Sequence, residues 1–137
     1  MTTETQKSIL MADDDEEDCF LATEAFMESG GKAAFSCVTD GVKLMEYLSA
    51  RSAPGPNGLP DLILLDLNMP IKNGREALLE IKSNPFFTSI PVVVLTTSAE
   101  KKDIEFSIGA GANLFITKPS AFNDWIEMMR SIVMRWL

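Results

Sequence analysis

Short apolar runs alternate along the chain with segments whose apolar residues recur at helical spacing. Each run has the length of a buried strand, and turn residues such as Gly, Pro, Asn and Asp separate it from the segment that follows. The strands are expected over residues 8–12, 33–38, 62–65, 91–96 and 114–118. A helix is expected after each of them, and the last two should span residues 100–108 and 121–136. The pattern therefore predicts five strand–helix units in succession.

Such strict alternation predicts an α/β fold, because a parallel strand needs a helical crossover to reach the next one. We expect a five-stranded parallel sheet in a doubly wound, flavodoxin-like three-layer sandwich. The length of 137 residues and the hydrophobic fraction of 46% suit one core. The chain is therefore expected to be a single domain over residues 1–137, with residues 1–7 as a frayed tail and no output domain.

Helical spacing also predicts the buried face of the first helix. Its inward residues are expected to be Phe20, Leu21, Ala25 and Phe26.

The chain has two cysteines, Cys19 and Cys37, and both fall within apolar patterns. We interpret them as small buried side chains rather than as a disulfide or a metal pair.

Charge and composition narrow the possible partners. The formal net charge is −8, whereas nucleic-acid binding needs a basic face, so we expect no nucleic-acid partner. The chain has no His, which excludes a Ser/His/Asp triad and a phosphohistidine on this chain. No apolar run is long enough to span a membrane and no leader opens the sequence, so we expect a cytoplasmic protein without membrane contact.

Polar side chains follow four of the predicted strands. Asp13 and Asp14 follow the first strand, Asp66 follows the third, Thr96 ends the fourth and Lys118 ends the fifth. Open α/β sheets form their sites outside the carboxyl ends of the strands, so these side chains should meet at one edge of the sheet. A second interpretation leaves Asp66 as a turn cap ahead of Pro70 and Gly74, because Asp is common in turns.

Six consecutive acids, residues 13–18, join the first strand to the first helix. Acidic side chains at a helix N-terminus are favoured by the helix dipole by about 0.3–1 kcal/mol each, which accounts for residues 16–18 without a function. Asp15 is expected to be the N-cap of this helix. Asp13 and Asp14 lie closer to the core and need another explanation.

Carboxylates gathered on one rim repel each other, by about 4 kcal/mol for a pair roughly 4 Å apart at an effective dielectric near 20. Asp13, Asp14 and Asp66 therefore need a cation, and oxygen-only ligands favour Mg²⁺, which binds through carboxylates and phosphate oxygens. Lys118 offers a positive charge and Thr96 a hydroxyl donor, and both suit a phosphoryl group. A structural Lys/Asp ion pair is the alternative, but it leaves the excess of acids unexplained.

Four segments at the strand tips resemble the receiver domain of two-component response regulators, and the resemblance covers essentially the whole chain. The segments are Ile9-Leu10-Met11-Ala12-Asp13-Asp14-Asp15, Leu65-Asp66-Leu67-Asn68-Met69-Pro70 with Gly74, Leu95-Thr96-Thr97-Ser98 and Phe115-Ile116-Thr117-Lys118-Pro119. Asn73 stands where many receivers have Asp, at a turn position where either residue serves. The Asn84-Pro85 segment, the end of the fourth strand and the Trp-rich last helix are most similar to the stand-alone receivers that serve phytochrome-type sensor kinases.

The resemblance implies roles for the acidic residues. Asp66 matches the phosphoacceptor, and Asp13 and Asp14 match the acidic pair that holds Mg²⁺. Asp66 itself and the backbone carbonyl of Asn68 would complete the protein ligands of the metal.

The resemblance also implies roles at the last two strands. Thr96 and Lys118 would bind the phosphoryl oxygens, and Thr96 with Phe115 would form the switch. A Phe in a strand is otherwise most often a core residue, so the switch role of Phe115 depends on the family alone. The Lys118–Pro119 bond matches one that is usually cis in the family.

By this resemblance the chain is a single-domain response regulator rather than an enzyme. It would accept a phosphoryl group on Asp66 from a sensor histidine kinase or a phosphotransfer protein, assist its own phosphorylation and dephosphorylation, and signal to a downstream protein target. An aspartyl-phosphate phosphohydrolase is an alternative, but such enzymes need a general acid where this chain has Asn68. A phosphorylation-independent scaffold would not need the full set of site residues, and a flavodoxin-like cofactor binder would need a phosphate cradle that no strand provides.

The last helix is expected to carry a partner surface at Trp125, Met129 and Trp136. Its apolar residues recur at helical spacing, and one stripe of them must cover the sheet as core. Met134 and Leu137 extend the apolar surface beyond one face. Because exposed Trp and Met clusters are common at interfaces, we expect a homodimer through this helix.

Overall fold

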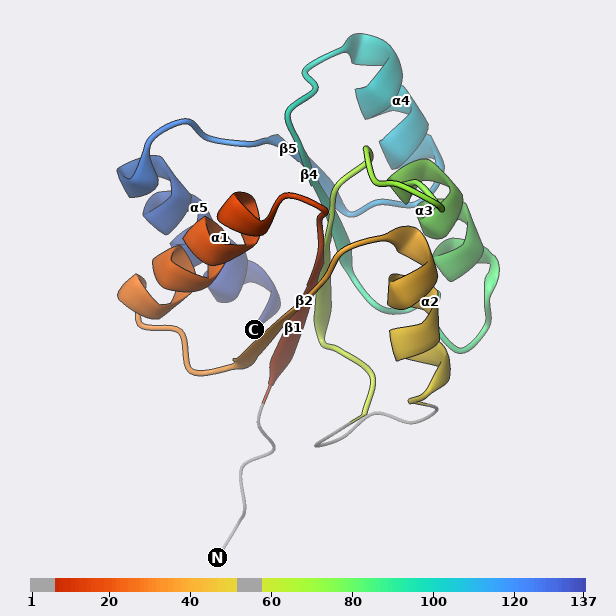
Figure 1. Ribbon diagram of the computed structural model, residues 1–137, viewed down its shortest axis with the longest axis horizontal. Helices are drawn as coiled ribbons and strands as arrows, with labels where there is room; N and C mark the ends of the chain where they lie inside the picture. The colour runs from red at the N-terminus through yellow and green to blue at the C-terminus, as the bar shows by residue number, and fades with distance from the viewer. Residues whose placement is uncertain (1–6, 52–57) are drawn as a thin grey trace, which may run out of the picture.

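The computed structural model describes residues 7–51 and 58–137 as alternating strands and helices (Figure 1). The strands are β1 Ser8–Ala12, β2 Ala34–Val38, β3 Leu62–Leu65, β4 Val92–Thr96 and β5 Leu114–Thr117. The helices are α1 Glu16–Glu28, α2 Gly41–Ser49, α3 Gly74–Ser83, α4 Lys101–Gly109 and α5 Phe122–Trp136. The expected frayed tail, apart from Lys7, lies outside the described residues, as do residues 52–57 of the loop before β3.

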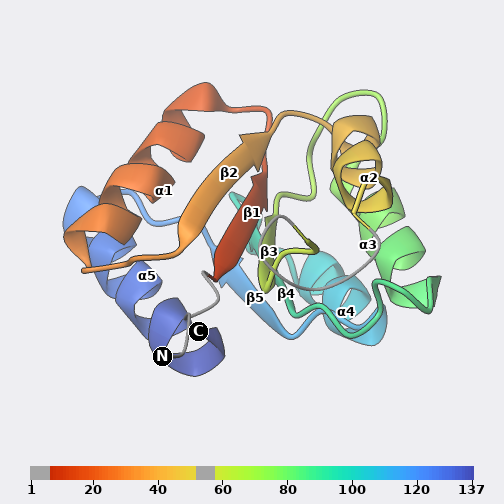
Figure 2. The same cartoon turned by 90° about the horizontal axis from the view of Figure 1, so that it is seen from below.

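The five strands pair in parallel in the order β2-β1-β3-β4-β5. Helices α1 and α5 cover one face of the sheet, and α2, α3 and α4 cover the other, as Figures 1 and 2 show. The predicted doubly wound three-layer sandwich is therefore confirmed. Within the described residues, no helix combines the length and the apolar character that a membrane crossing requires.

Strand β3 lies at the centre of the sheet and is buried on both faces. Leu62 and Leu64 belong to the hydrophobic cluster under α1 and α5, whereas Ile63 and Leu65 belong to the cluster under α2 and α3. Successive side chains of a strand point to opposite faces, which is why a strand between two helical layers is apolar at every position. Asp66 follows directly, so it leaves the core at the carboxyl edge of the sheet.

The inward stripe of α5 consists of Trp125, Met129 and Ile132, which recur at helical spacing. Their side chains pack with α1 and the sheet and are 1%, 0% and 1% exposed. Trp125 and Met129 are therefore core residues, and the expectation that they form a partner surface is wrong. Trp136, one turn after Ile132, is only partly buried against the same cluster.

The buried face of α1 agrees with the expected one at Ala25 and Phe26 and in part at Leu21, but not at Phe20. Cys19, Ala22 and Phe26 are buried, whereas Phe20 is 65% exposed because adjacent helix residues point about 100° apart. The expected burial is confirmed for Cys19 and wrong for Cys37, which is exposed on β2. Strand β2 is at the edge of the sheet, where the helical layer covers it incompletely.

Candidate functional site

The carboxyl ends of the strands bring the predicted polar side chains to one edge of the sheet. The Asp66 amide donates to the Ala12 carbonyl at 3.0 Å, which continues the pairing of β1 with β3 and sets Asp66 beside Asp13. The Lys118 amide donates to the Thr96 carbonyl at 2.7 Å and joins the ends of β4 and β5 in the same way. The parallel register of the sheet therefore assembles these positions.

Asp13, Asp14 and Asp66 form a carboxylate cluster in which one oxygen of each residue lies within 4.8 Å of the others. Asp13 and Asp66 are buried and Asp14 is exposed, so the cluster opens to solvent on one side. Among the described residues, Asp13 Oδ2 is one of two buried side-chain polar atoms without a hydrogen-bond partner. This oxygen faces the Lys118 ammonium 2.7 Å away, and the all-oxygen donor set of the three carboxylates suits a hard ion such as Mg²⁺. The three carboxylates would hold that ion.

The loop after β3 folds back over Asp66. The Asn68 amide donates to Asp66 Oδ1 at 3.3 Å, which places the Asn68 backbone beside the carboxylate cluster. The Gly74 amide donates to the Leu67 carbonyl at 3.0 Å, and a Cβ on Gly74 would lie only 2.0 Å from the Asp66 carbonyl oxygen, so the loop requires glycine there. Asn73 caps α3 with its side chain, so Asn is compatible with this turn. The Asn68 carbonyl as a metal ligand stays a prediction.

The Lys118 side chain is 6% exposed and contacts three carboxylates. Its Nζ lies 2.7 Å from Asp13 Oδ2, 2.7 Å from Asp18 Oδ2 and 3.5 Å from Asp66 Oδ2. The Asp13 contact is an ion pair whose geometry leaves Oδ2 without a directed hydrogen bond. Burial lowers the pKa of Lys118, but the contacts with Asp13 and Asp18 and the charge of Asp66 outweigh it and hold that pKa above its usual value. Lys118 is therefore a permanent positive charge at the site.

Metal binding should depend on the protonation of Asp13. Burial raises the pKa of Asp13 to about 6, and the contact with Lys118 offsets this only in part. Because Mg²⁺ needs the ionised carboxylate, we expect its affinity to be constant above about pH 7 and to fall by about tenfold per pH unit below about pH 6. Calorimetric titrations with Mg²⁺ between about pH 5 and pH 8 measure this, and an affinity that stays flat over that range would contradict it.

In the metal-free protein, the free energy of unfolding should change with pH in the opposite direction to the Mg²⁺ affinity. The folded state binds the Asp13 proton more tightly than the unfolded chain does, because its pKa is raised from 3.8 to about 6. In EDTA, this group therefore increases the free energy of unfolding as the pH falls through about 6.

Thr96 is 0% exposed, and its Oγ1 is the other buried polar atom without a hydrogen-bond partner in the described part of the chain. A hydroxyl can donate one hydrogen bond, and a phosphoryl oxygen would be a suitable acceptor.

Phe115 pairs with Val94 in the sheet and packs half-buried against the cluster under α2 and α3. The Lys118–Pro119 bond is trans, the intrinsically preferred isomer, so the expected cis bond is wrong here.

A polar network that sequence reasoning missed anchors the loop after β4. Ser98 Oγ donates to Asp103 at 2.6 Å, and Arg75 donates to the other oxygen of the same carboxylate at 2.7 Å. These two hydrogen bonds hold the pKa of Asp103 below its usual range. Thr117 Oγ1 donates to the Ser98 carbonyl at 3.0 Å. The network therefore ties the loop that follows Thr96 to α3, α4 and β5.

The N-terminus of α1 also contributes to the site. The Asp15 side chain accepts from the amides of Glu17 and Asp18 at 3.0 and 3.2 Å, so the predicted N-cap is confirmed. Sequence reasoning assigned Asp18 only to the helix dipole, but its side chain accepts a hydrogen bond from Lys118. No feature of the sequence near Asp18 indicated this contact, because Lys118 lies 100 positions away.

The sheet order alone does not define a function, because folds of this kind carry unrelated activities. The site adds a buried aspartate, Asp66, that belongs to a carboxylate cluster and faces a lysine, which is the arrangement expected from the resemblance to receiver domains. Residues 9–130 match the family model of the response regulator receiver domain. The chain therefore belongs to the response regulator receiver family, as its motifs predicted.

Relatives resemble the chain over nearly its whole length. Response regulator Rcp1 of Synechocystis sp. is 38% identical over 96% of this chain and 89% of that protein. Probable methanogenesis regulatory protein FilR2 of Methanothrix harundinacea is 33% identical over 94% of this chain and 83% of that protein.

Two solved structures show the same fold with comparable identity. The phosphorylated cyanobacterial phytochrome response regulator RcpA has a TM-score of 0.85 at 38% identity, over 96% of this chain and 94% of that chain. The Mn²⁺-bound form of Rcp1 has a TM-score of 0.83 at 39% identity, with the same coverage of both chains. Together with the acidic cluster, these findings confirm the predicted response regulator with a divalent-cation site suited to Mg²⁺.

Proposed function

We propose that Asp66 is the residue that accepts the phosphoryl group. One of its carboxylate oxygens attacks the phosphorus of a phosphohistidine, the P–N bond breaks with its electron pair returning to the imidazole, and an acyl phosphate remains on Asp66. Mg²⁺ held by Asp13, Asp14 and Asp66 would supply positive charge to the phosphoryl oxygens. Lys118 neutralises one of these oxygens, and Thr96 donates a hydrogen bond to another. Such a transfer depends mostly on positioning and charge stabilisation.

The observation that carries this proposal is the place of Asp66 in the site. Its side chain is 7% exposed, lies 3.5 Å from the Lys118 ammonium, and shares the carboxylate cluster that suits a cation. The phosphohydrolase alternative would need an acidic proton two residues later, and the amide of Asn68 has none.

The same residues should assist both phosphorylation and dephosphorylation, so a small phosphodonor should suffice. We expect the protein to gain one phosphoryl group from acetyl phosphate with Mg²⁺ and none in EDTA, as measured by intact mass. Asp66→Asn should gain none, whereas Asp124→Asn, a control at an exposed position of α5, should behave like the parent. A mass gain that survives Asp66→Asn would refute the assignment.

Receiver domains exchange phosphoryl groups with histidine kinases or phosphotransfer proteins, and we propose a phytochrome-type sensor kinase as the donor for this chain. The support is the 38% identity to the phytochrome response regulator RcpA over 96% of this chain. A downstream protein target would read the phosphorylated state.

The proposed location is the cytoplasm, where the thiols of the two free cysteines, Cys19 and Cys37, stay reduced.

Thr96 and Phe115 are the proposed switch. Thr96 would turn toward a phosphoryl oxygen, Phe115 would fill the space it leaves, and the face formed by α4, β5 and α5 would shift. We expect phosphorylation of the parent to change amide hydrogen exchange in β5 and α4. Thr96→Ala should accept the phosphoryl group but lose most of that change, whereas Thr97→Ala, at the exposed neighbouring position, should keep it. Equal changes in Thr96→Ala and the parent would rule out the coupling.

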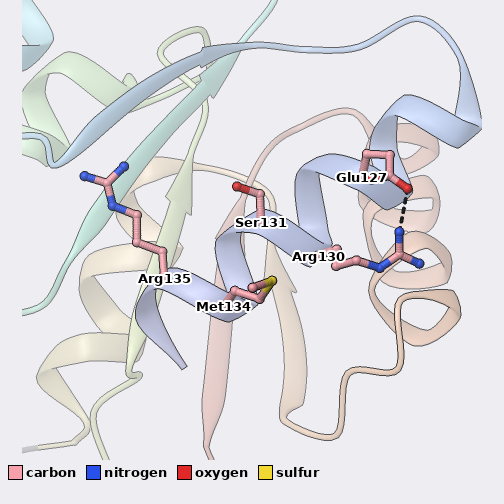
Figure 3. Close-up of a pocket in the computed structure, with 5 residues that line it drawn as sticks. All are labelled: Glu127, Arg130, Ser131, Met134 and Arg135. Atoms are coloured by element: carbon pink, nitrogen blue, oxygen red, sulfur yellow. Dashed lines mark hydrogen bonds and ion pairs between the residues drawn. The ribbon is translucent and has the colours of Figure 1, made fainter.

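For self-association we propose the outward face of α5, because its inward stripe belongs to the core. A shallow hollow of about 420 Å³ lies there, lined by Glu127, Arg130, Ser131, Met134 and Arg135. Figure 3 shows these side chains and the ion pair between Glu127 and Arg130. Met134 is 82% exposed, and a two-fold pair would set the acid of one helix against the arginines of the other. We expect sedimentation at micromolar concentration to show a dimer that Met134→Glu weakens and Met27→Glu on α1 does not. A monomeric parent would refute this interface.

A further inference from the structure

Lys118 has a carboxylate partner outside the metal cluster. Its Nζ lies 2.7 Å from Asp18 Oδ2, the same distance as to Asp13 Oδ2. Asp18 is on the first turn of α1, its side chain is 19% exposed, and it is not among the three carboxylates that gather within 4.8 Å. In the described part of the chain, the other two ion-pair partners of Lys118 are Asp13 and Asp66, and both belong to that cluster.

The position of Asp18 is fixed by hydrogen bonds at the start of α1. The Asp15 amide donates to Asp13 Oδ1 at 2.9 Å, and the Asp18 amide donates to Asp15 Oδ1 at 3.2 Å. The helix therefore begins at a set distance from the cluster, and the Asp18 carboxylate is held against the ammonium of Lys118.

The role of Asp18 follows from the charges around Lys118. An ammonium group donates three hydrogen bonds, and here it faces three carboxylates. A divalent cation on Asp13 and Asp66 would repel the ammonium from both of these residues. Asp18 is then the acceptor that keeps the ammonium in place.

We propose that Asp18 is a positioning residue that holds the Lys118 ammonium beside Asp66 while the carboxylate cluster binds Mg²⁺. The inference rests on the proposed function of the site, because the ammonium must stay in reach of the phosphoryl oxygens on Asp66. Without Asp18, the ammonium settles on the two metal ligands and competes with the cation for them.

Calorimetric titration with Mg²⁺ tests this competition directly. Asp18→Asn should weaken Mg²⁺ binding by roughly tenfold, the scale of one lost charge-assisted hydrogen bond. Glu17→Gln is the matched control, since it removes the same charge from an exposed position of the same helical turn that is not among the ion-pair partners of Lys118 in the described residues. It should change the affinity by no more than about twofold, as expected of a screened surface charge. Thermal melts in EDTA check that both variants are folded.

A double-mutant cycle separates the proposed role from a loss of charge. In the Lys118→Met background there is no ammonium to hold, so Asp18→Asn should weaken Mg²⁺ binding no more than Glu17→Gln does. The inference is overturned if the two single variants bind Mg²⁺ equally well. It is also overturned if the effect of Asp18→Asn persists undiminished in the Lys118→Met background.

Phosphorylation gives a second readout. At saturating Mg²⁺, Asp18→Asn should accept the phosphoryl group from acetyl phosphate roughly tenfold more slowly than the parent, because Lys118 is no longer aimed at the transferring oxygens. An unchanged rate would overturn the inference. If the parent accepts no phosphoryl group at all, the proposed function fails, and the calorimetric cycle still decides the role of Asp18.

Discussion

Asp14→Ala should lose Mg²⁺ binding almost completely, with a fall in affinity of roughly 100-fold or more, yet fold normally in EDTA. Asp14 is the exposed member of the carboxylate cluster, so its removal leaves no cavity in the core. It also removes one of three like charges whose oxygens lie within 4.8 Å, so the metal-free variant should melt at the same or a slightly higher temperature. Calorimetric titration with Mg²⁺ and melting in EDTA measure the two effects.

Asp15→Ala is the matched control for this prediction. Asp15 caps α1 by accepting two backbone amide hydrogen bonds, and the loss of such a cap costs about 1 kcal/mol of stability. It is not part of the cluster, so the Mg²⁺ affinity should fall far less than in Asp14→Ala, by no more than the loss of the Asp15 hydrogen bond to the Asp18 amide causes through Lys118. Two neighbouring aspartates should therefore behave in opposite ways. A clear loss of stability in metal-free Asp14→Ala would show that its carboxylate is structural.

The strands and the edge that carries the site could be predicted because both follow from local pattern. A strand buried on both faces is apolar at every position, and it ends where the chain turns polar, as at Leu65 and Asp66. The parallel topology then brings the polar ends together without any knowledge of individual contacts. The observed strands Ala34–Val38 and Leu114–Thr117 differ from the expected ones by only one residue.

The faces of the helices were harder to predict, because the size of a side chain is a poor guide to which way it points. On α1, the small residues Cys19 and Ala22 lie in the buried stripe, whereas the aromatic Phe20 lies beside it and is exposed. On α5, both a core stripe and an outward face carry large apolar residues. Sequence reasoning assigned Trp125 to the surface, although the stripe that contains it fills the space over the sheet.

Contacts between distant residues left no local signal. Asp18 and Lys118 are 100 positions apart, and Arg75 and Asp103 are 28 positions apart. An acid in the first turn of a helix is already favoured by the helix dipole, so nothing in the sequence demanded a further partner for Asp18. These pairings depend on how the helices sit against the sheet.

Trp125→Ala should be among the most destabilising single substitutions in the chain, with a loss of about 3–5 kcal/mol in the free energy of unfolding. The Trp125 side chain is 1% exposed and packs in the cluster with α1 and the sheet, so truncation leaves a cavity that the surrounding elements cannot close. Domains of this size are commonly stable by only about 5–15 kcal/mol, so the variant should melt far below the parent. Urea unfolding followed by circular dichroism measures the loss.

Trp136→Ala is the natural comparison, because it removes the same side chain from the same helix at a partly buried position. It should cost less, on the order of 1–2 kcal/mol, since part of the space it leaves is open to solvent. Trp125→Phe should restore much of the stability lost in Trp125→Ala, because a second aromatic ring fills most of the cavity. If Trp125→Ala proved no more destabilising than Trp136→Ala, the inward face of α5 would not be the core that joins α1 to the sheet.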